Sequence, residues 1–414
     1  MTFVRKSAST LPLEDAVFAV ARAAAKDRQE NGDLVVNATV GSLFDEDGSF
    51  VAFDSVFDHY DGIDHTTKGS YAAAFLGNPG FRDAVWNWTT QTADIALAHS
   101  VVATPGGSGA VATSFVTFLD EGETVILPDI AWGSYQLMAS HNNLKVRNYE
   151  MFEGDHFNLR SVKEAIDEVL NTQDRIVLVV NDPCHNPTGY SMTMEEWNGL
   201  IAILNEAGEK AAVILINDIA YIDYSYRGNR AREYMSLFNG FSDNVLAVTA
   251  FSCSKALTSY GLRCGAAILM SQKQESVQEA ETVFEKAARA CWSNVPNAAM
   301  DNFAWVVTDN REAYLTEKQH YVDLLKERSE IFVKEAEECG LPIYPYKEGF
   351  FVTIKEADRK KAVAEHEALM ENHIYTVLVN KGIRVAVCSL PVRKAKGLAK
   401  RIKDIMDSAN GKGA

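Results

Sequence analysis

The chain has 414 residues, of which 47% are hydrophobic and 23% charged, a composition typical of a folded globular protein. This length exceeds what one hydrophobic core usually holds, so two domains are expected. The formal net charge of −16 argues against a broad binding surface for nucleic acid or for an anionic membrane.

The N-terminus and the cysteine and histidine patterns also exclude several classes of protein. The first ten residues lack the apolar centre of a signal peptide, and no apolar run is long enough to span a bilayer. The six cysteines contain no CxxC pair and the nine histidines no HExxH pattern. We therefore predict a cytoplasmic protein that binds no metal and has no disulfide framework.

The chain is expected to open with a helix and a strand. Helical spacing of apolar residues predicts the helix, and the residues that carry the pattern are Leu13, Val17, Val20 and Ala24. The segment 33–41 then has the pattern of a strand that ends at Gly41. A glycine there could let the backbone approach a ligand, although such a glycine more often only makes a turn.

A glycine-rich turn is the next feature that suggests binding. The segment 68–80, which contains Tyr71, is expected to be an ordered loop before a helix. A short strand at 99–104 then runs into the turn 105–110 and a helix. A strand, a glycine-rich turn and a helix together favour phosphate, because the amides and the helix dipole attract an anion, and Ser108 adds a hydroxyl. The turn matches neither a Walker loop nor GxGxxG, so by itself it is a weak signal.

Three further apolar strands each lead to polar or aromatic residues. The residues that follow them are Trp132, Asn186 and Asp218. Carboxyl ends of parallel strands line the ligand crevice of an open sheet, so these side chains are expected to converge. Taken alone, Trp132 is better interpreted as a core aromatic residue. The strands are predicted at 124–128, 175–180 and 211–218, with helices at 161–170 and, capped by Thr193 and Glu196, up to residue 204.

The stretch 249–266 carries the strongest chemical signal. A strand from residue 245 leads to Ser252 and then to Lys255, and Arg263 follows in a second turn. A lysine on a small-residue turn can form a Schiff base with an aldehyde cofactor or a carbonyl substrate. Ser252 and Arg263 could together hold a phosphate. For this stretch alone, a surface lysine with incidental serines is an equally good interpretation.

The last quarter of the chain has the pattern of an α+β unit. It consists of a long charged helix, an antiparallel type of strand, a helix, a strand and a final helix. These elements are predicted at 301–339, 349–354, 366–380, 382–389 and 392–408.

Together these motifs resemble the pyridoxal-phosphate-dependent aminotransferases of fold type I, in the aspartate and aromatic aminotransferase branch. The resemblance covers nearly the whole chain and rests mainly on Cys184-His-Asn-Pro-Thr-Gly189, on Asp218 with Tyr221, and on Ser252-x-x-Lys255 with Arg263. It implies a large α/β domain with a mostly parallel sheet, residues 50–310. A smaller α+β domain would consist of residues 1–49 plus 311–414.

The resemblance also implies how the cofactor is held. Lys255 would bind pyridoxal 5'-phosphate covalently and carry a proton between the substrate Cα and the cofactor. Asp218 would bind the pyridine nitrogen, Tyr221 and Asn186 the phenolic oxygen, and Trp132 would stack on the ring. The phosphate would be bound by Gly107, Ser108, Ser252 and Arg263, and by Tyr71 of the other subunit of a homodimer.

For the substrate, the resemblance points to two arginines. Arg384 matches the residue that binds the α-carboxylate, and Arg289 the residue that crosses the dimer to bind the distal carboxylate of a dicarboxylic acid. Gly41, Asn186 and Trp132 would complete the substrate site. Three residues depart from the usual pattern and leave the exact pocket open: Gly106, Trp292 and Val295.

We therefore expect an aminotransferase that moves the amino group of L-aspartate to 2-oxoglutarate by a ping-pong mechanism. An aromatic enzyme with dual specificity is an alternative, and the same fold also supports β-elimination and decarboxylation. A cofactor-binding sensor without turnover is a further alternative, but the acidic charge and the lack of a DNA-binding region argue against it. The expected partners are a second copy of the chain and small amino and 2-oxo acids, with no nucleic acid and no membrane.

Overall fold

The computed structural model describes residues 3–5, 7–11 and 16–411. The helix α1 (Ala16–Asn31) confirms most of the first predicted helix, while Leu13 lies outside the described residues. Among the described residues, no helix combines the length and the apolar character needed to cross a bilayer. In the same part of the chain, no group of three or more His, Cys, Asp and Glu side chains could hold a metal ion.

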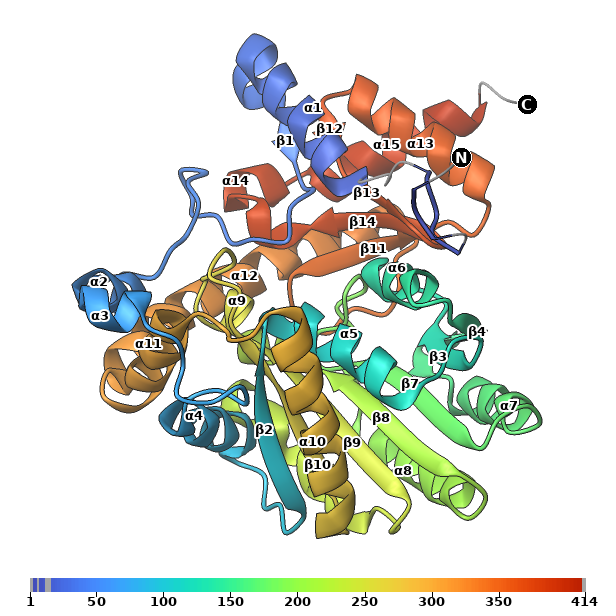
Figure 1. Cartoon of the computed structure of the whole chain (residues 1–414). Helices are drawn as coiled ribbons and strands as arrows, with labels where there is room; N and C mark the ends of the chain where they lie inside the picture. Colours follow the sequence, from blue (N-terminus) through green and yellow to red (C-terminus); the bar gives the residue numbers. More distant parts are fainter. Residues whose placement is uncertain (1–2, 6, 12–15, 412–414) are drawn as a thin grey trace.

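A seven-stranded sheet forms the centre of the larger part of the molecule (Figure 1). Its strands are parallel except for one, β10, which runs antiparallel to both of its neighbours. In order across the sheet the strands are β2 (Ala98–Thr104), β10 (Gly265–Ser271), β9 (Val245–Ser252), β8 (Ala212–Asp218), β7 (Arg175–Asn181), β3 (Thr124–Pro128) and β4 (Lys145–Tyr149).

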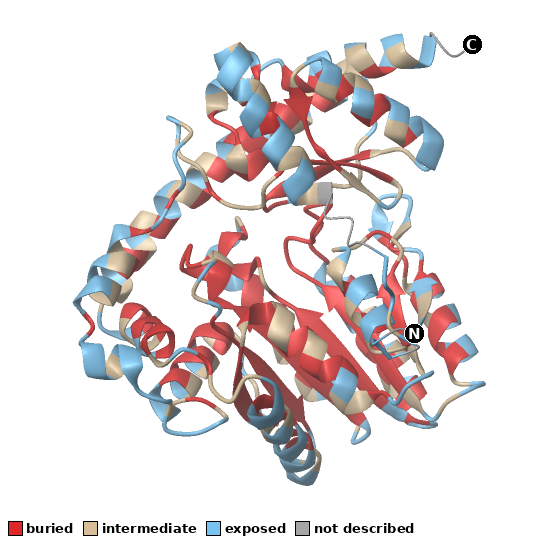
Figure 2. Cartoon of the chain, turned by 45° about the horizontal axis from the view of Figure 1, so that its top comes forward, coloured by how far each residue is buried: buried red, intermediate tan, exposed pale blue. Residues whose placement is uncertain are grey.

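Both faces of the central strands of this sheet are buried, which explains why strands such as β7 and β8 are nearly continuous apolar runs (Figure 2). Successive residues of β7 point to opposite faces and enter two different cores. Val177 and Val179 pack in the core that includes residues of α5 (Gly106–Phe118), whereas Ile176 and Leu178 pack in the other core, with residues of α8 (Met194–Gly208). The capping box predicted for α8, made by Thr193 and Glu196, is confirmed.

The antiparallel strand β10, which we did not predict, decides where Arg263 lies. Its first residue, Gly265, pairs with Ser252 at the end of β9. Arg263 therefore returns to the edge of the sheet at which Lys255 leaves it. Through this hairpin, two residues eight positions apart in sequence reach one site.

A second, smaller set of elements lies over the carboxyl edge of the large sheet (Figure 1). Strands β11 (Phe351–Lys355), β14 (Gly382–Ala386) and β13 (Val377–Val379) form an antiparallel sheet. Strand β1 (Val36–Asn37) pairs in parallel with β12 (Ile374–Tyr375), so the N-terminal segment joins the C-terminal part of the chain. The division of the domains at residues 50 and 310 stays a prediction.

Five predicted elements differ from the structure. The turn predicted at 105–110 is helical from Gly106 onward and forms the start of α5. The strand predicted at 33–41 is limited to the two residues of β1. The helix predicted at 301–339 is two helices, α11 (Asn297–Thr308) and α12 (Arg311–Cys339). The last helix is likewise divided into α14 (Val392–Ala395) and α15 (Leu398–Gly411), with Gly397 between them at a left-handed φ of 74°.

The helix predicted at 366–380 is wrong beyond its middle. The observed helix α13 (Arg359–Glu371) begins earlier and ends before His373, which adopts a left-handed φ of 62°. Strands β12 and β13 follow, in a stretch rich in β-branched and aromatic residues. The spacing of the apolar residues in this stretch fits both a helix and a strand, and pairing with neighbouring strands decides for the strand.

The remaining elements connect or cover these sheets. They are η1 (Gly32–Leu34), α2 (Asp54–Gly62), α3 (His65–Gly69), α4 (Pro79–Thr90), α6 (Ser134–His141), β5 (Phe152–Glu153), β6 (His156–Phe157), α7 (Leu159–Val169), η2 (Ile222–Tyr224), η3 (Gly228–Gly240), α9 (Cys253–Ala256), α10 (Gln274–Cys291) and η4 (Val387–Ser389).

Candidate active site

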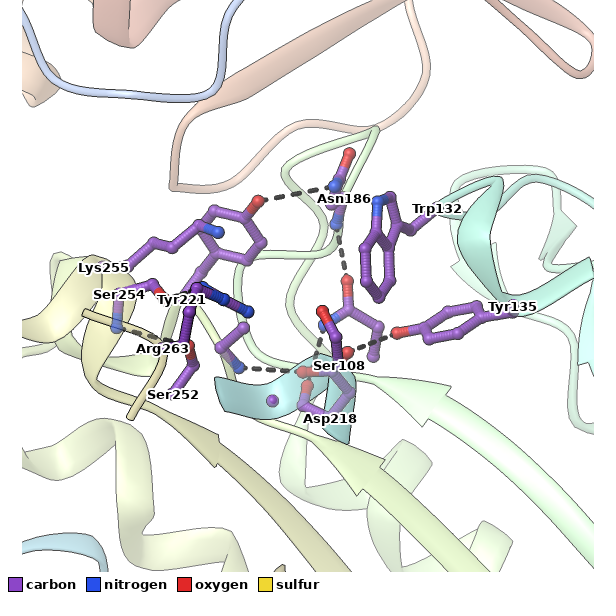
Figure 3. Close-up of a pocket in the computed structure, with 13 residues that line it drawn as sticks. Ser108, Trp132, Tyr135, Asn186, Asp218, Tyr221, Ser252, Ser254, Lys255 and Arg263 are labelled. Carbon is purple, nitrogen blue, oxygen red and sulfur yellow. Dashed lines mark hydrogen bonds between the residues drawn. The ribbon is translucent and has the colours of Figure 1, made fainter. Parts of the chain in front are cut away.

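A pocket lies at the carboxyl edge of the large sheet, where strands β7, β8 and β9 end and helix α5 begins (Figure 3). It contains about 500 Å³ of space outside the protein atoms, part of it open to solvent. Nine of the residues predicted from sequence line it, and they are Gly107, Ser108, Trp132, Asn186, Asp218, Tyr221, Ser252, Lys255 and Arg263. The convergence predicted for Trp132, Asn186 and Asp218 is therefore confirmed, whereas the roles assigned to the nine residues stay predictions.

Lys255 lies on the single turn of α9, directly after β9. Its Nζ lies 5.4 Å from the centre of the Tyr221 ring and 5.7 Å from that of Tyr260. Burial lowers the pKa of Lys255 to about 8, although the opposite charge of Asp218 acts against this change. A large fraction of this amine is therefore neutral near pH 8 and can act as a nucleophile.

Asp218, the last residue of β8, is the buried anion of the site. Its Oδ2 accepts a hydrogen bond of 2.5 Å from the Tyr135 hydroxyl, and its Oδ1 accepts one of 3.0 Å from the amide of Ala220. Burial raises the pKa of Asp218, and these hydrogen bonds oppose the rise. Among the described residues no cation forms an ion pair with it, so a protonated ring nitrogen would supply the missing opposite charge.

The other end of the pocket is suited to an anion. Helix α5 begins at Gly106, and no side chain caps its first turn, which leaves amides available to a ligand. The Arg263 guanidinium lies beside this helix end, because its Nη2 donates to the Pro105 carbonyl at 3.2 Å and its Nη1 to Ser254 Oγ at 3.1 Å. Ser108 and Ser252 add hydroxyls to the same end of the pocket.

Gly106 departs from the family pattern for a steric reason visible here. Its φ of 72° is left-handed, and a Cβ at this position would lie 2.7 Å from Nη2 of Arg263. A larger residue would therefore have to displace the arginine. The glycine gives up a side-chain contact to the ligand and keeps the guanidinium close to the helix end.

Asn186 connects this pocket to Arg384. Its Nδ2 donates to the Tyr221 hydroxyl at 3.4 Å, and its Oδ1 accepts from Nη1 of Arg384 at 3.2 Å. Arg384 is buried, donates to the Thr39 carbonyl, and has an Nε without a hydrogen-bond partner among the described residues. A buried guanidinium with a free N–H is suited to a substrate carboxylate.

Four predicted site residues do not line the pocket of their own chain: Arg384, which contacts it through Asn186, and Tyr71, Arg289 and Gly41. Tyr71 is 83% exposed. Arg289, at the end of α10, is exposed, donates to Ser293 Oγ and lies over the Phe75 ring at 5.1 Å. Gly41 lies beside Phe351, since a Cβ on it would be 2.6 Å from that ring.

The pocket also contains residues to which we had assigned no role. These are Tyr135, Asn181, Ala220 and Ser254. Tyr135 lies three positions after Trp132, in the first turn of α6, and Asn181 ends strand β7, so both positions carried a signal. Because a tyrosine beside a tryptophan is usually a packing residue, only the contact with Asp218 reveals Tyr135 as part of the site.

The side chains of the pocket fit pyridoxal phosphate. The amides of α5 with Arg263 suit a phosphate, Asp218 suits a protonated ring nitrogen, and Lys255 provides an amine for an aldehyde. Trp132 provides a flat face at the pocket wall (Figure 3).

Comparison with known proteins gives the same assignment. Residues 68–402 match the family model described as aminotransferase class I and II. The crystal structure of an aminotransferase from Anaerococcus prevotii is 33% identical and superposes with a TM-score of 0.94, over 99% of this chain and 100% of that one.

Two curated relatives are more distant. The aspartate aminotransferase of Escherichia coli is 25% identical over 57% of this chain and 59% of its own length. The aromatic-amino-acid aminotransferase of Pseudomonas aeruginosa is 25% identical over 50% of each chain. The chain thus spans between half and three fifths of the length of these curated relatives.

Proposed function

The chain belongs to the aminotransferase class I and II family, and we propose that it moves the amino group of an L-amino acid, L-aspartate above all, to 2-oxoglutarate. The observation that carries this proposal is the placement of Lys255 and Asp218 in one pocket that also has an anion site. The reaction would be of the ping-pong type, with donor and acceptor using the same pocket in turn.

Pyridoxal phosphate, when bound, supplies an aldehyde for the substrate amine and a ring that withdraws electrons from Cα. Lys255 would hold the cofactor, and its amine, once freed, would act as the general base that takes up the proton of the substrate Cα. Asp218 keeps the ring nitrogen protonated, and Tyr135 holds the Asp218 carboxylate in place. Asn186 and Tyr221 bind the phenolic oxygen, while Gly107, Ser108, Ser252 and Arg263 bind the phosphate.

Arg384 binds the substrate α-carboxylate in this proposal. Its guanidinium is fixed by Thr39 and Asn186 and packs over the Phe351 ring at 4.3 Å. The Arg384 side chain therefore loses little conformational entropy when the carboxylate binds. Gly41 lies next to the same Phe351 ring and lets the backbone approach the substrate. Trp132 closes the site on the side of the cofactor ring.

The choice of donor depends on Arg289. If it reaches the pocket of a second subunit, its guanidinium pairs with the distal carboxylate of aspartate, glutamate or 2-oxoglutarate. The two curated relatives carry the names of an aspartate and of an aromatic-amino-acid enzyme. Dual use of dicarboxylic and aromatic donors is therefore the alternative to a dicarboxylate enzyme.

A homodimer with shared sites is part of this proposal, and site residues that their own chain leaves exposed support it. Tyr71 and Arg289, both assigned to the site, face solvent, and so do Val116 on α5 and Val283 on α10. Site residues that do not line the pocket of their own chain are expected where a second copy completes the site. We assign this dimer to the cytoplasm because the cysteine pattern suits a reducing compartment.

The proposal is tested by replacing Lys255. Lys255→Ala should abolish the visible absorption of covalently bound cofactor and lower kcat with aspartate and 2-oxoglutarate by roughly 10³-fold or more. Lys273→Ala, which changes a half-exposed lysine beyond the end of β10 that points away from the site, serves as the control and should keep both. Turnover retained by the Lys255 variant would disprove the assignment.

The donor is identified by spectra of the wild-type protein with aspartate, glutamate, tyrosine, alanine and cysteine added singly. Loss of the yellow band with aspartate and glutamate alone would support a dicarboxylate enzyme. The same loss with tyrosine would show dual specificity. A band that no donor changes would favour a sensor, and a colourless protein that takes up no cofactor would overturn the proposal.

A further inference from the structure

The loop that carries Asn186 is buried throughout its length, from residue 181 to residue 192. Loops usually run over the surface, because a buried loop must find partners for all its backbone polar groups. This loop finds several of them in its own side chains. Asn181 Oδ1 accepts from the Asn186 amide at 2.7 Å, and Ser191 Oγ accepts from the Cys184 amide at 2.9 Å.

Glu348, which precedes strand β11, is a carboxylate that holds this loop from outside. Its side chain is buried, and its Oε1 accepts a hydrogen bond of 2.6 Å from Ser191 Oγ and one of 3.2 Å from Arg227 Nη2. Its Oε2 accepts from Ser225 Oγ at 2.6 Å and from the Tyr226 amide at 2.8 Å. A buried carboxylate with four donors is fixed in direction and fixes its partners in turn.

The backbone around Glu348 lies directly against the same loop. The amides of Lys347 and Glu348 both donate to the Gly189 carbonyl at 2.9 Å. Gly349 packs so closely that a Cβ on it would be 2.7 Å from the Cβ of Cys184. The segment 347–349 therefore restricts the position of the loop that carries Asn186.

We propose that Glu348, acting through the Ser191 hydroxyl, is a positioning residue for Asn186. The inference rests on the proposed function, in which Asn186 and Tyr221 bind the phenolic oxygen of the cofactor. Asn186 has only a 3.4 Å contact to Tyr221 and a 3.2 Å contact to Arg384, so a small tilt of its loop changes both. Glu348 thus links the smaller sheet, through β11, to the hydrogen bonds that Asn186 and Tyr221 would make with the phenolic oxygen of the cofactor.

The two serines provide a matched test, because each donates a 2.6 Å hydrogen bond to Glu348. Only Ser191 belongs to the loop of Asn186, whereas Ser225 follows η2. In the holoenzyme, Ser191→Ala should shift the pH at which the cofactor absorption changes by about half a unit or more, and lower kcat about tenfold. Ser225→Ala loses an equal bond but should leave that pH and kcat unchanged.

Glu348→Gln provides the second arm. It should reproduce the spectral shift of Ser191→Ala, and the double variant should shift no further than either single one, because both act on one contact. Additive shifts, equal shifts from both serine variants, or no shift from Ser191→Ala would overturn the inference. Should the Gln variant fail to fold, the serine pair still decides.

The two proposals fail in different ways. A wild-type protein without cofactor absorption, or one that no donor changes, contradicts the proposed function and with it the inference. A wild-type enzyme that turns over, with a titration that Ser191→Ala does not move, contradicts the inference alone.

Discussion

Burial shifts the pKa values of Lys255 and Asp218 in opposite directions. Desolvation disfavours the charged form of each, so it lowers the pKa of the amine and raises that of the carboxyl. Their attraction works against both changes. The result is an amine that loses its proton easily and a carboxylate that is ready for a cationic partner, which are the two properties that binding of pyridoxal phosphate requires.

The lowered pKa of Lys255 predicts how cofactor uptake depends on pH. Only the neutral amine attacks an aldehyde, and its fraction rises about tenfold per pH unit below the pKa and levels off above it. In protein freed of cofactor, the rate of uptake should therefore rise with pH and level off above about 8. Stopped-flow absorption between about pH 6 and pH 10 measures this, and a rate still rising at pH 10, as for an ordinary lysine, would contradict it.

The Tyr135 hydroxyl predicts a second effect at the residue scale. Tyr135→Phe keeps the ring but removes a hydrogen bond that lowers the pKa of Asp218, so the carboxylate holds its charge less firmly. We expect kcat to fall by about tenfold, in the range for hydrogen bonds to charged groups. Tyr149→Phe is the matched control, because that buried hydroxyl donates to the Val179 carbonyl instead. Steady-state kinetics with equal effects of both changes would remove Tyr135 from the site.

At the scale of the elements, a helix or strand could be predicted where the pattern of apolar residues fits only one kind of secondary structure. Buried parallel strands such as 124–128 are continuous apolar runs, and their ends could be assigned from sequence. The antiparallel strand β10 could not, because its direction depends on pairing with β9 and β2. The stretch 374–379 was misassigned for the same reason, since tertiary pairing overrode an ambiguous pattern.

The site shows the same division between local and distant information. Lys255, Asp218 and Asn186 stand in local motifs that strand ends bring together, so their convergence could be predicted. The contact of Tyr135 with Asp218 joins residues 83 positions apart, and no local pattern records it. Roles for Tyr71 and Arg289 depend on a second chain and stay predictions.

The capping box of α8 gives an element-scale prediction. Thr193 Oγ1 accepts from the Glu196 amide at 3.1 Å, and Glu196 accepts from the Thr193 amide at 2.7 Å. Thr193→Ala should lower the free energy of unfolding by about 1 kcal/mol in urea titration. Thr282→Ala, on the exposed face of α10, should change it by less than about 0.5 kcal/mol. Equal changes would show that the cap contributes nothing.

At the scale of the whole molecule, the smaller set of elements lies over the carboxyl edge of the large sheet (Figure 1), the edge at which the pocket is found. Lys381 Nζ donates to Asp129 Oδ2 at 2.5 Å, which ties the turn between β13 and β14 to the end of β3. Three residues after Lys381, Arg384 on β14 donates a hydrogen bond to Asn186 in the larger part of the chain. The substrate carboxylate would therefore bind where the two parts of the chain meet, and contacts from both would act on it.

In the proposed dimer, one wall of the pocket would belong to a second chain. Arg289 packs on Phe75 of its own chain and does not line its own pocket. In a twofold dimer, a residue near the interface can serve the partner's site, and each site is then built from both chains. Arg289→Gln should accordingly reduce kcat/KM for aspartate by about tenfold or more, and that for phenylalanine far less.

Mixed dimers test whether the sites are shared. Chains with Lys255→Ala and chains with Arg289→Gln each lack one part of the site, so both homodimers are impaired with aspartate. In a mixed dimer, the intact Lys255 of one chain and the intact Arg289 of the other build one complete site. If equal amounts of the two chains reassociate at random, about a quarter of all sites should be complete, and aspartate turnover should return to about a quarter of the wild-type level. If Arg289 served the pocket of its own chain, no mixed dimer would contain a complete site, and mixing would restore nothing.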